Sequence, residues 1–300
     1  MPALRGALSS CFSQTYEPKE VVVADGMSTD GTLEELKKWP LTVLSDGGRG
    51  LAYARQLLLE ASHGKYVLWV DADHVLPDDF LEKQVAYAEA HPELGAVEAL
   101  IYPLDGGTVG FTEGLTRLVL SSRRARRGSS LPASGTPATL FRREAAFQAG
   151  GFDLRFRSAG EDSMITRAMR AKGWKFAVNP SAWAYHAGRP SWRELWREYY
   201  NWGKAARKVS EAYPGTVSAW KSFPPAAFFS GMLNAVRAAK LSGSSLSLLV
   251  PLHSLYKRTA WTYGYLKGRN LLSESAAHRL NPMEASYSPI AFLKDLHMFS

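Results

Sequence analysis

The chain has 300 residues, 46% of them hydrophobic, which is enough to bury a large core. Its single cysteine, Cys11, excludes an internal disulfide and a cysteine-based zinc site and is typical of a reducing compartment. The formal net charge is +8, but thirteen Lys or Arg and only three Glu lie between residues 189 and 269, so the rest of the chain is slightly acidic. No signal-peptide pattern opens the chain and no apolar run reaches the roughly 18 residues of a membrane span, so we expect a cytoplasmic protein.

The amino-terminal part alternates short apolar runs with helical stretches. We expect strands at residues 21–24, 41–44 and 66–70, separated by helices at 33–38 and 51–61. Strands and helices that alternate at this spacing form right-handed βαβ units. The sequence therefore predicts an α/β fold with a Rossmann-like, mostly parallel sheet flanked by helices.

The alternation continues beyond residue 80 and ends in a basic, helical region. Helices are expected at residues 80–90, 111–120, 144–149, 161–172 and 191–211, and strands at 96–102, 139–141, 174–178 and 182–185. The strand at 139–141 is expected at a sheet edge, and the loop at 128–137, rich in Gly, Ser and Pro, is expected to be mobile. We divide the chain into an α/β domain at residues 1–212 and a helical extension at residues 213–300.

Two carboxylates, Asp71 and Asp73, follow directly on the apolar run at residues 66–70. Ligands of open α/β sheets bind beyond the carboxyl ends of the strands. One or two carboxylates suit Mg²⁺ or Mn²⁺, whose other coordination positions are filled by water and substrate phosphate. The pair therefore predicts a divalent-cation site for a nucleotide diphosphate, unless these acids only cap the helix that begins near Asp78.

Six sequence segments occur together, and their order gives each of them more meaning than it has alone. They are Ser13-Gln-Thr-Tyr16, Glu20-Val-Val-Val-Ala-Asp-Gly-Met-Ser-Thr-Asp-Gly-Thr32, Asp71-Ala-Asp73, Gly150-Gly-Phe-Asp153, Glu161-Asp162, and His186 before a helix rich in Trp and Tyr. In this order they resemble the family 2 glycosyltransferases over roughly residues 3–208. The resemblance implies the GT-A fold, which binds nucleotide sugars, and transfer of a hexose with inversion.

The resemblance assigns contacts with the sugar donor to two loops. Asp25 would accept hydrogen bonds from the nucleotide base, and Ser28 lies in the same loop. Arg49, in Gly47-Gly-Arg-Gly50, would reach the donor, which is a UDP- or GDP-sugar. Without the family's motif order, Asp25 is as readily a turn-forming residue and Arg49 a plain loop residue.

The resemblance also implies a Mn²⁺ or Mg²⁺ ion that binds the diphosphate of the donor. Asp73 would bind the ion directly, Asp71 would contact the ribose or the ion, and His186 would complete the coordination shell. Such a cation stabilises the negative charge that develops on the departing diphosphate. A lone histidine is more often structural than a ligand, so the role of His186 stays open at this point.

Glu161-Asp162 opens the helix expected at residues 161–172. By resemblance, Asp162 is the general base that deprotonates the acceptor hydroxyl, and Glu161 orients the acceptor or the base. Acids in the first turn of a helix also complement its dipole, so the pair has an ordinary structural interpretation too. The predicted function is inverting, metal-dependent transfer of a hexose from a nucleotide-diphosphate sugar to a lipid-linked or saccharide acceptor.

The chain departs from the family in two places. The family's first strand, with its Pro-x-Tyr/Phe-Asn-Glu type of motif, should precede the helix at residues 3–13, and this sequence does not contain it; an upstream start, a truncation and a true loss are all open explanations. The Gln-x-x-Arg-Trp motif of processive members has only a degraded counterpart, Glu198-Tyr-Tyr-Asn-Trp202, which favours a single transfer over polymer synthesis.

The extension at residues 213–300 mixes short apolar runs, aromatic residues and Lys or Arg. Such segments can lie in a membrane interface, with their cations near anionic headgroups. We therefore expect peripheral attachment to the inner face of the cell membrane and a lipid-phosphate or glycan acceptor, whose phosphate Arg123-Arg-Ala-Arg-Arg127 could bind. The alternatives are helices packed on the α/β domain or in a homo-oligomer, and a noncatalytic or nucleic-acid-binding protein. The acidic pairs argue against nucleic acid as the partner.

Overall fold

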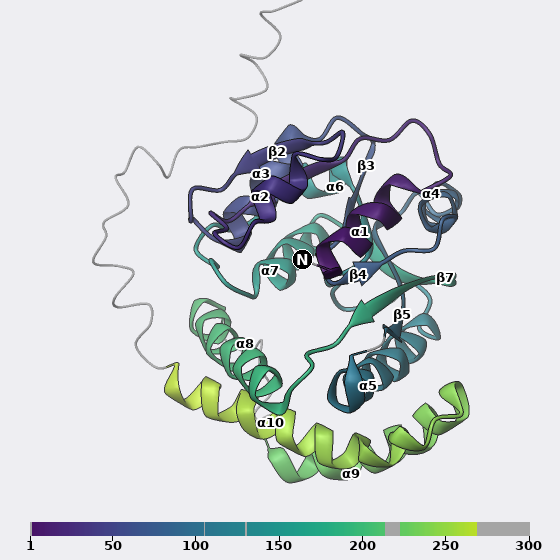
Figure 1. Ribbon diagram of the computed structural model, residues 1–300, viewed down its shortest axis with the longest axis vertical. Coiled ribbons are helices and arrows are strands. Elements are labelled where there is room, and N and C mark those ends of the chain that lie inside the picture. Colours follow the sequence, from purple (N-terminus) through teal and green to yellow (C-terminus); the bar gives the residue numbers. More distant parts are fainter. Residues whose placement is uncertain (1, 105, 130, 214–222, 269–300) are drawn as a thin grey trace, which may run out of the picture.

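The computed structural model describes residues 2–104, 106–129, 131–213 and 223–268 (Figure 1). Its first elements are α1 (Pro2–Phe12), β1 (Val22–Asp25), α2 (Thr32–Leu36), β2 (Thr42–Ser45), α3 (Leu51–Ala61), β3 (Tyr66–Trp69), β4 (His74–Val75) and α4 (Phe80–Ala90). They are followed by β5 (Leu94–Leu104), α5 (Gly107–Ala125), β6 (Thr139–Arg142), α6 (Arg143–Gln148), α7 (Glu161–Ala171), β7 (Lys175–Ala187) and α8 (Trp192–Ala212). The last are α9 (Pro224–Ser242), the 3₁₀ helix η2 (Ser245–Leu249) and α10 (Val250–Lys267).

Two sheets form instead of the single, mostly parallel sheet that the sequence predicts. β1 and β2 make a parallel pair, and the second sheet has the strand order β3-β6-β5-β7-β4. Within it β5 and β7 are parallel, whereas β3 and β5 run antiparallel to β6, and β4 runs antiparallel to β7. The α/β class is confirmed. The mostly parallel pairing is wrong because β6 does not lie at an edge but inserts between β3 and β5, with all its residues buried.

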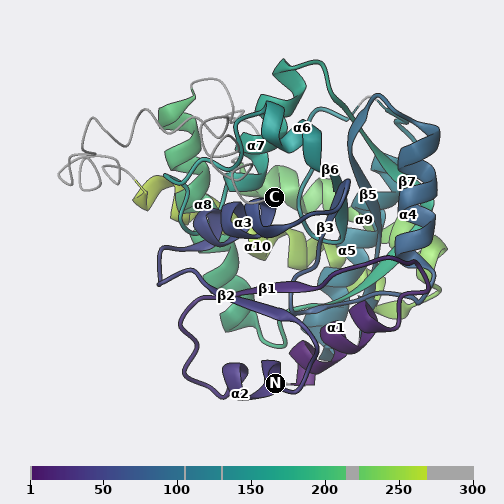
Figure 2. The ribbon, with the colours of Figure 1, turned by 90° about the horizontal axis from the view of Figure 1, so that it is seen from above.

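No strand in the described part of the chain joins the two sheets. Within that part β1 pairs only with β2 and β3 only with β6. Figure 2 shows β1 and β2 as neighbours on the side of the molecule that carries α2. The family's first strand would precede α1, and the described strands offer no substitute for it.

One long strand, β7, replaces the two strands that the sequence predicts between residues 174 and 185. Its register against β5 shifts between Asn179 and Trp183. Pro180 lies in this shift, and it lacks the N–H that a regular ladder requires. Because the strand resumes after the shift, it brings His186 opposite His74 of β4.

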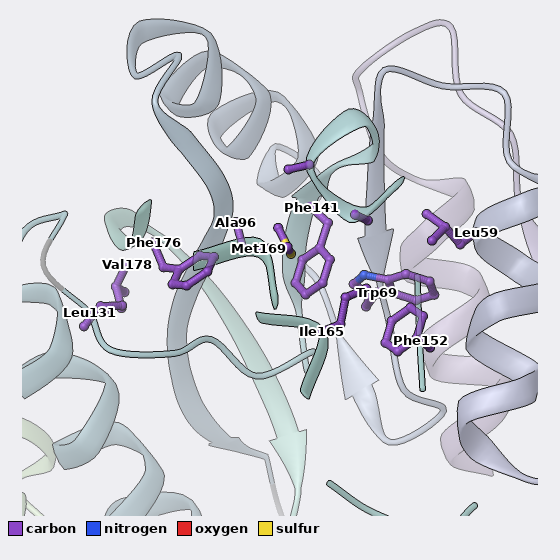
Figure 3. Packing of buried hydrophobic residues seen from close by; sticks show 12 residues of the cluster. Leu59, Trp69, Ala96, Leu131, Phe141, Phe152, Ile165, Met169, Phe176 and Val178 are labelled. Atoms are coloured by element: carbon purple, nitrogen blue, oxygen red, sulfur yellow. The ribbon is translucent and has the colours of Figure 1, made fainter. Parts of the chain in front are cut away.

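In the largest hydrophobic cluster of the described residues, the end of β3 packs against helix α7 (Figure 3). The Trp69 ring lies edge-on to Phe141 of β6 and to Phe152, with ring centroids 6.0 and 5.3 Å away. Ile165 and Met169 of α7 are buried in the same cluster. Each large apolar side chain contributes about 1.5–3 kcal/mol when it is fully buried. Packing therefore fixes the end of β3 relative to α7, and both elements adjoin predicted site residues.

Helices α8, α9 and α10 pack on α5, on the far side from β1 and β2 (Figure 1). α8 and α10 approach closely at Gly203 and Gly264, where a Cβ atom on either glycine would lie 2.0 Å from a carbonyl oxygen of the other helix. Inside this layer the Lys257 ammonium of α10 donates to Glu113 and Thr116 of α5, at 2.5 and 2.9 Å. A buried ion pair therefore joins the last described helix to the α/β body.

The division between residues 212 and 213 stays a prediction. Helix α8 ends at Ala212, and residues 214–222 and 269–300 lie outside the described residues. The extension is helical over the part that is described, residues 223–268. None of the described helices is both long enough and apolar enough to cross a membrane.

Candidate active site

Asp73, His74 and His186 form a cluster where β4 pairs with β7. The two histidines face each other across this ladder, with ring centroids 4.7 Å apart. The Asp73 carboxylate contacts both: Oδ1 is 3.0 Å from His74 Nδ1, and Oδ2 is 3.6 Å from His186 Nε2. One ligand atom from each residue lies within 4.8 Å of the others, so the three residues could hold a metal ion together.

The electrostatics of this cluster suit a cation. Burial disfavours the Asp73 carboxylate, but hydrogen bonds from His186 and His74 outweigh it and hold the pKa of Asp73 well below its usual range. Burial lowers the pKa of His186, which keeps its imidazole neutral and able to act as a ligand. His74 Nε2 and His186 Nδ1 are buried without a hydrogen-bond partner in the described part of the chain. Carboxylate oxygen and imidazole nitrogen are both ligand types that divalent metal ions take in proteins.

Asp71 lies outside this cluster and contacts a buried arginine instead. Its Oδ1 is 3.3 Å from Nη2 of Arg55, and its side chain is 40% exposed. The other terminal nitrogen of Arg55, Nη1, donates to Oε1 of Glu161 at the start of α7. Arg55 thus bridges the acid that follows β3 and the acid pair of α7, so both acidic segments belong to one site.

Arg55 has no predicted role, although the sequence contains a signal for it. It lies on α3 between Ala52 and Leu59, at the spacing of one helix face, and all three residues are buried. Arginine is rarely buried unless it has a partner. A charged residue in the middle of an apolar helix face could therefore have marked this position. His74 was missed for another reason, because its contact with His186 depends on strand pairing.

Glu161 and Asp162 differ in exposure and in their partners. Glu161 is 2% exposed, so its carboxylate contacts Arg55 rather than solvent. Burial and the neighbouring Asp162 charge raise the pKa of Glu161 to about 7, against the opposing charge of Arg55. Asp162 is half-buried, and its Oδ1 accepts a hydrogen bond of 2.6 Å from the Ser163 N–H. Burial raises the pKa of Asp162 as well, which suits a base that works near neutral pH.

The loop after β1 is held by Asp25. This carboxylate is buried, and its Oδ2 accepts a hydrogen bond of 3.1 Å from the Ser28 N–H. The Asp46 N–H donates to the Asp25 carbonyl at 3.0 Å, which ties the loop to the end of β2. The Ser28 side chain is exposed. Asp25 therefore has the turn-forming role, and the contacts of Asp25 and Ser28 with a donor stay predictions.

The loop that precedes α3 contacts Arg157, which lies in the segment before α7. Arg157 donates from Nε to the Arg49 carbonyl and from Nη2 to the Gly48 carbonyl, at 3.0 and 2.8 Å. Gly50 has a φ of 99°, and a Cβ atom there would lie 2.5 Å from the Arg157 carbonyl oxygen, so only glycine fits. The Arg49 guanidinium stacks on Tyr53, 3.4 Å from the ring centroid. Its contact with a donor stays a prediction.

The family of the chain follows from comparison with known proteins. The model of the family described as Glycosyl transferase family 2 matches residues 2–147. Residues 2–147 form a glycosyltransferase family 2 domain. The resemblance seen in the sequence is thereby confirmed, and the match begins at residue 2, the first residue of α1.

This family 2 chain is similar in sequence to several curated proteins. It is 30% identical over 90 residues to an uncharacterized glycosyltransferase of Haemophilus influenzae, an alignment that covers 28% of this chain and 36% of that protein. It is 29% identical over 203 residues to the succinoglycan biosynthesis protein ExoO of Rhizobium meliloti, covering 60% of this chain and 56% of ExoO. The chain thus spans about a third to just over half of the length of these relatives.

Solved structures show the same fold. The mannosyltransferase PcManGT of Pyrobaculum calidifontis superposes with a TM-score of 0.54 at 21% sequence identity, covering 100% of this chain and 77% of that chain. GalNAc-T7 gives a TM-score of 0.50 at 16% identity, covering 91% of this chain and 54% of that chain. The GT-A fold that the sequence predicts for this family 2 chain is confirmed.

Arg189, which follows β7, is a cation beside the metal cluster of the family 2 chain. Its Nη2 lies 3.6 Å from Asp73 Oδ2 and 3.1 Å from Glu198 Oε1, and its side chain is 42% exposed. Glu198 opens the degraded counterpart of the processive motif. This segment therefore holds Arg189 next to Asp73.

The loop at residues 131–137 is anchored beside Asp162, in contrast to the mobility expected of it. Arg124 pairs with Glu98 through Nε and Nη2, at 2.8 and 2.6 Å, and donates to the Ala133 carbonyl at 2.6 Å. The Gly135 N–H donates to Glu98 at 3.0 Å, and a Cβ atom on Gly135 would lie 3.7 Å from Asp162 Oδ2. Arg124 is thus engaged in holding this loop, and the phosphate contact expected of the basic run at 123–127 stays a prediction.

Proposed function

We propose that this chain transfers a hexose, with inversion, from a nucleotide-diphosphate sugar to a lipid-linked or saccharide acceptor, with Mn²⁺ or Mg²⁺ as cofactor. The observation that carries the proposal is Arg55, which joins Asp71 to Glu161 and so brings the two acidic segments to one site. The donor class is supported by two proteins of similar fold. Their solved structures hold GDP-Man with Mn²⁺ in one case and UDP, GalNAc and Mn²⁺ in the other.

Asp73 and His186 would hold the cation, and His74 would orient the Asp73 carboxylate through their 3.0 Å contact. A bound divalent cation supplies Lewis-acid stabilisation of the charge that develops on the departing diphosphate. Arg189 is partly exposed beside Asp73, so its guanidinium can contact the same diphosphate. Asp71, held by Arg55, is left to contact the ribose or the hydration shell of the cation.

Asp162 is assigned as the general base. Its Oδ1 accepts from the Ser163 N–H, which leaves Oδ2 to accept the proton of the acceptor hydroxyl. As the acceptor oxygen forms its bond to the anomeric carbon, the bond from that carbon to the diphosphate breaks. The diphosphate leaves with the electron pair on the opposite face, so the configuration inverts. Glu161, paired with Arg55, positions the first turn of α7 for this step.

A donor screen tests the proposal. UDP- and GDP-sugars are added with Mn²⁺, with Mg²⁺ or with a chelator, and the midpoint of thermal unfolding is measured, because a ligand that prefers the folded protein raises its stability. We expect one nucleotide class to stabilise the wild type only when metal is present. Asp73→Asn should lose this response, and Asp162→Asn should keep it. No response to any donor, or a metal-independent response that survives in Asp73→Asn, would contradict the proposal.

A further inference from the structure

Helix α9 exposes the side that a helix of a soluble protein normally buries. Its exposed apolar residues are Phe229, Met232, Leu233 and Val236, with exposed fractions of 67%, 50%, 63% and 58%. Their spacing of three, one and three residues puts all four on one face of a helix with 3.6 residues per turn. Ala238, on the opposite side, is buried against α5. The bulky apolar residues therefore point away from the body of the protein.

The neighbouring elements carry two further exposed apolar residues. Leu248 of η2 is 77% exposed and Leu252 of α10 is 57% exposed. α9 lies close to α10 at this point, because a Cβ atom on Gly231 would be 2.7 Å from the Cα atom of Pro251. Figure 1 shows α9 and α10 together along one edge of the molecule. We name this surface the outer face, made of Phe229, Met232, Leu233, Val236, Leu248 and Leu252.

The charged residues of the segment that carries the outer face are all cations. Residues 223–268 contain no Asp or Glu. Arg237 and Lys240 of α9 and Lys267 at the end of α10 are exposed, whereas Lys257 is buried against Glu113 and adds no charge to the surface. An apolar surface on a segment whose charged residues are all cations is complementary to a partner that has an apolar interior and a negatively charged boundary.

We propose that the outer face binds the surface of a bilayer that contains anionic phospholipids, with α9 lying in the plane of the interface. The apolar side chains enter the boundary between headgroups and acyl chains, and Arg237 and Lys240 contact headgroup phosphates. A second copy of this chain fits less well. A two-fold interface would bring the cations of both copies into one contact area, and the segment at residues 223–268 has no acid to pair with them.

Helix α5 connects the outer face to the metal cluster. It packs on α9 through Leu115, Val119 and Ala238, and its Gly110 contacts Gly188, two residues after His186. Helices α9 and α5 both lie between a bilayer on the outer face and the cluster, and each helix layer adds about 8–10 Å. A lipid-linked acceptor would have to span this depth to reach the site. The supply of an acceptor from the bilayer rests on the proposed function, whereas binding of the protein to the bilayer does not.

Vesicle flotation with the full chain tests this surface. The protein is mixed with vesicles of phosphatidylcholine alone, or of equal parts phosphatidylcholine and phosphatidylglycerol, and floated through a density gradient at low and at high salt. We expect the wild type to float with the anionic vesicles at low salt. Phe229→Gln/Leu233→Gln should partition roughly 30-fold more weakly. Arg237→Gln/Lys240→Gln should lose roughly 30-fold, on the anionic vesicles only.

The matched control is Val43→Gln/Leu154→Gln, which changes two exposed apolar residues outside the outer face and should float like the wild type. Failure of the wild type to float at low salt, or an equal loss in the control, overturns the proposal. A wild-type dimer in sedimentation velocity that Phe229→Gln/Leu233→Gln dissociates also overturns it, because a second copy would then cover the face. Flotation requires no turnover, so its failure is distinguishable from failure of the proposed transfer.

Discussion

Removing Arg55 should destabilise the fold by an amount that depends on pH. In Arg55→Met, the buried Glu161 loses the cation that its Oε1 contacts. Breaking a buried ion pair by removing one partner costs about 3–5 kcal/mol. We therefore expect the free energy of unfolding to fall by about that amount at pH 8, where the unfolded chain leaves Glu161 ionised.

The direction of the pH dependence follows from the pKa of Glu161. Burial and the Asp162 charge raise it to about 7 in the wild type, above the value of about 4.3 in an unfolded chain. A folded state that binds the proton more tightly than the unfolded state loses stability as pH rises through this window. Without Arg55 the pKa rises further, and each additional unit costs about 1.4 kcal/mol above the window. Near pH 5 the folded state of both proteins has Glu161 protonated, so there the difference shrinks to the lost packing and the lost contact with Asp71.

Urea unfolding followed by circular dichroism at pH 5 and pH 8 measures both differences. The matched control is Arg55→Met/Glu161→Gln, which removes both charges and should recover most of the loss at pH 8. The bridge would be refuted by an Arg55→Met loss that is the same at both pH values. It would also be refuted by a double variant that is as unstable at pH 8 as the single one.

Three further predictions concern chemistry and packing. Asp162→Asn should lower kcat about 10²–10⁴-fold with a hydroxyl acceptor and leave donor affinity unchanged. Product formation measures this, and near-normal turnover would contradict the base assignment, whereas a mild loss is expected if the acceptor is already a phosphate. His74→Phe should weaken Mn²⁺ binding about 10–100-fold, as loss of an orienting partner does. Manganese EPR titration checks this against the exposed His63→Phe, and equal affinities would remove the orienting role. Gly264→Ala should lower the free energy of unfolding by about 1–3 kcal/mol or more, because its Cβ atom would lie 2.0 Å from a carbonyl oxygen of α8. Gly6→Ala, with no atom closer than 3.5 Å, should be tolerated, and a similar effect of both would contradict close packing of α8 and α10.

Local signals account for what the sequence predicted correctly. Two short-range patterns were predicted correctly: a strand that ends just before Asp71 and a helix that begins with Glu161. In the structure β3 ends at Trp69 and α7 begins at Glu161. The proximity of Asp73 and His186 was different, because no local pattern links two residues on separate strands. It came from the family's motif order, and the pairing of β4 with β7 provides its physical basis.

Long-range pairing accounts for what the sequence could not give. β6 has only four residues, and its place between β3 and β5 depends on both neighbours. β4 has two residues and is defined by its pairing with β7, so the role of His74 has no signal of its own. The partners of Arg55 come from segments far apart in the chain. For α9, an amphipathic pattern does not say which side is packed, and here the side with small residues is buried.

Anomalous diffraction at the manganese edge tests the central claim most directly, with crystals grown from the full chain, Mn²⁺ and the nucleotide diphosphate that the donor screen selects. We predict a manganese peak in contact with Asp73 and His186, a diphosphate bound to it, and the Asp162 carboxylate facing the same cavity. A metal and nucleotide bound elsewhere, or an Asp162 that opens into a separate cavity, would contradict the claim that the two acidic segments form one transferase site.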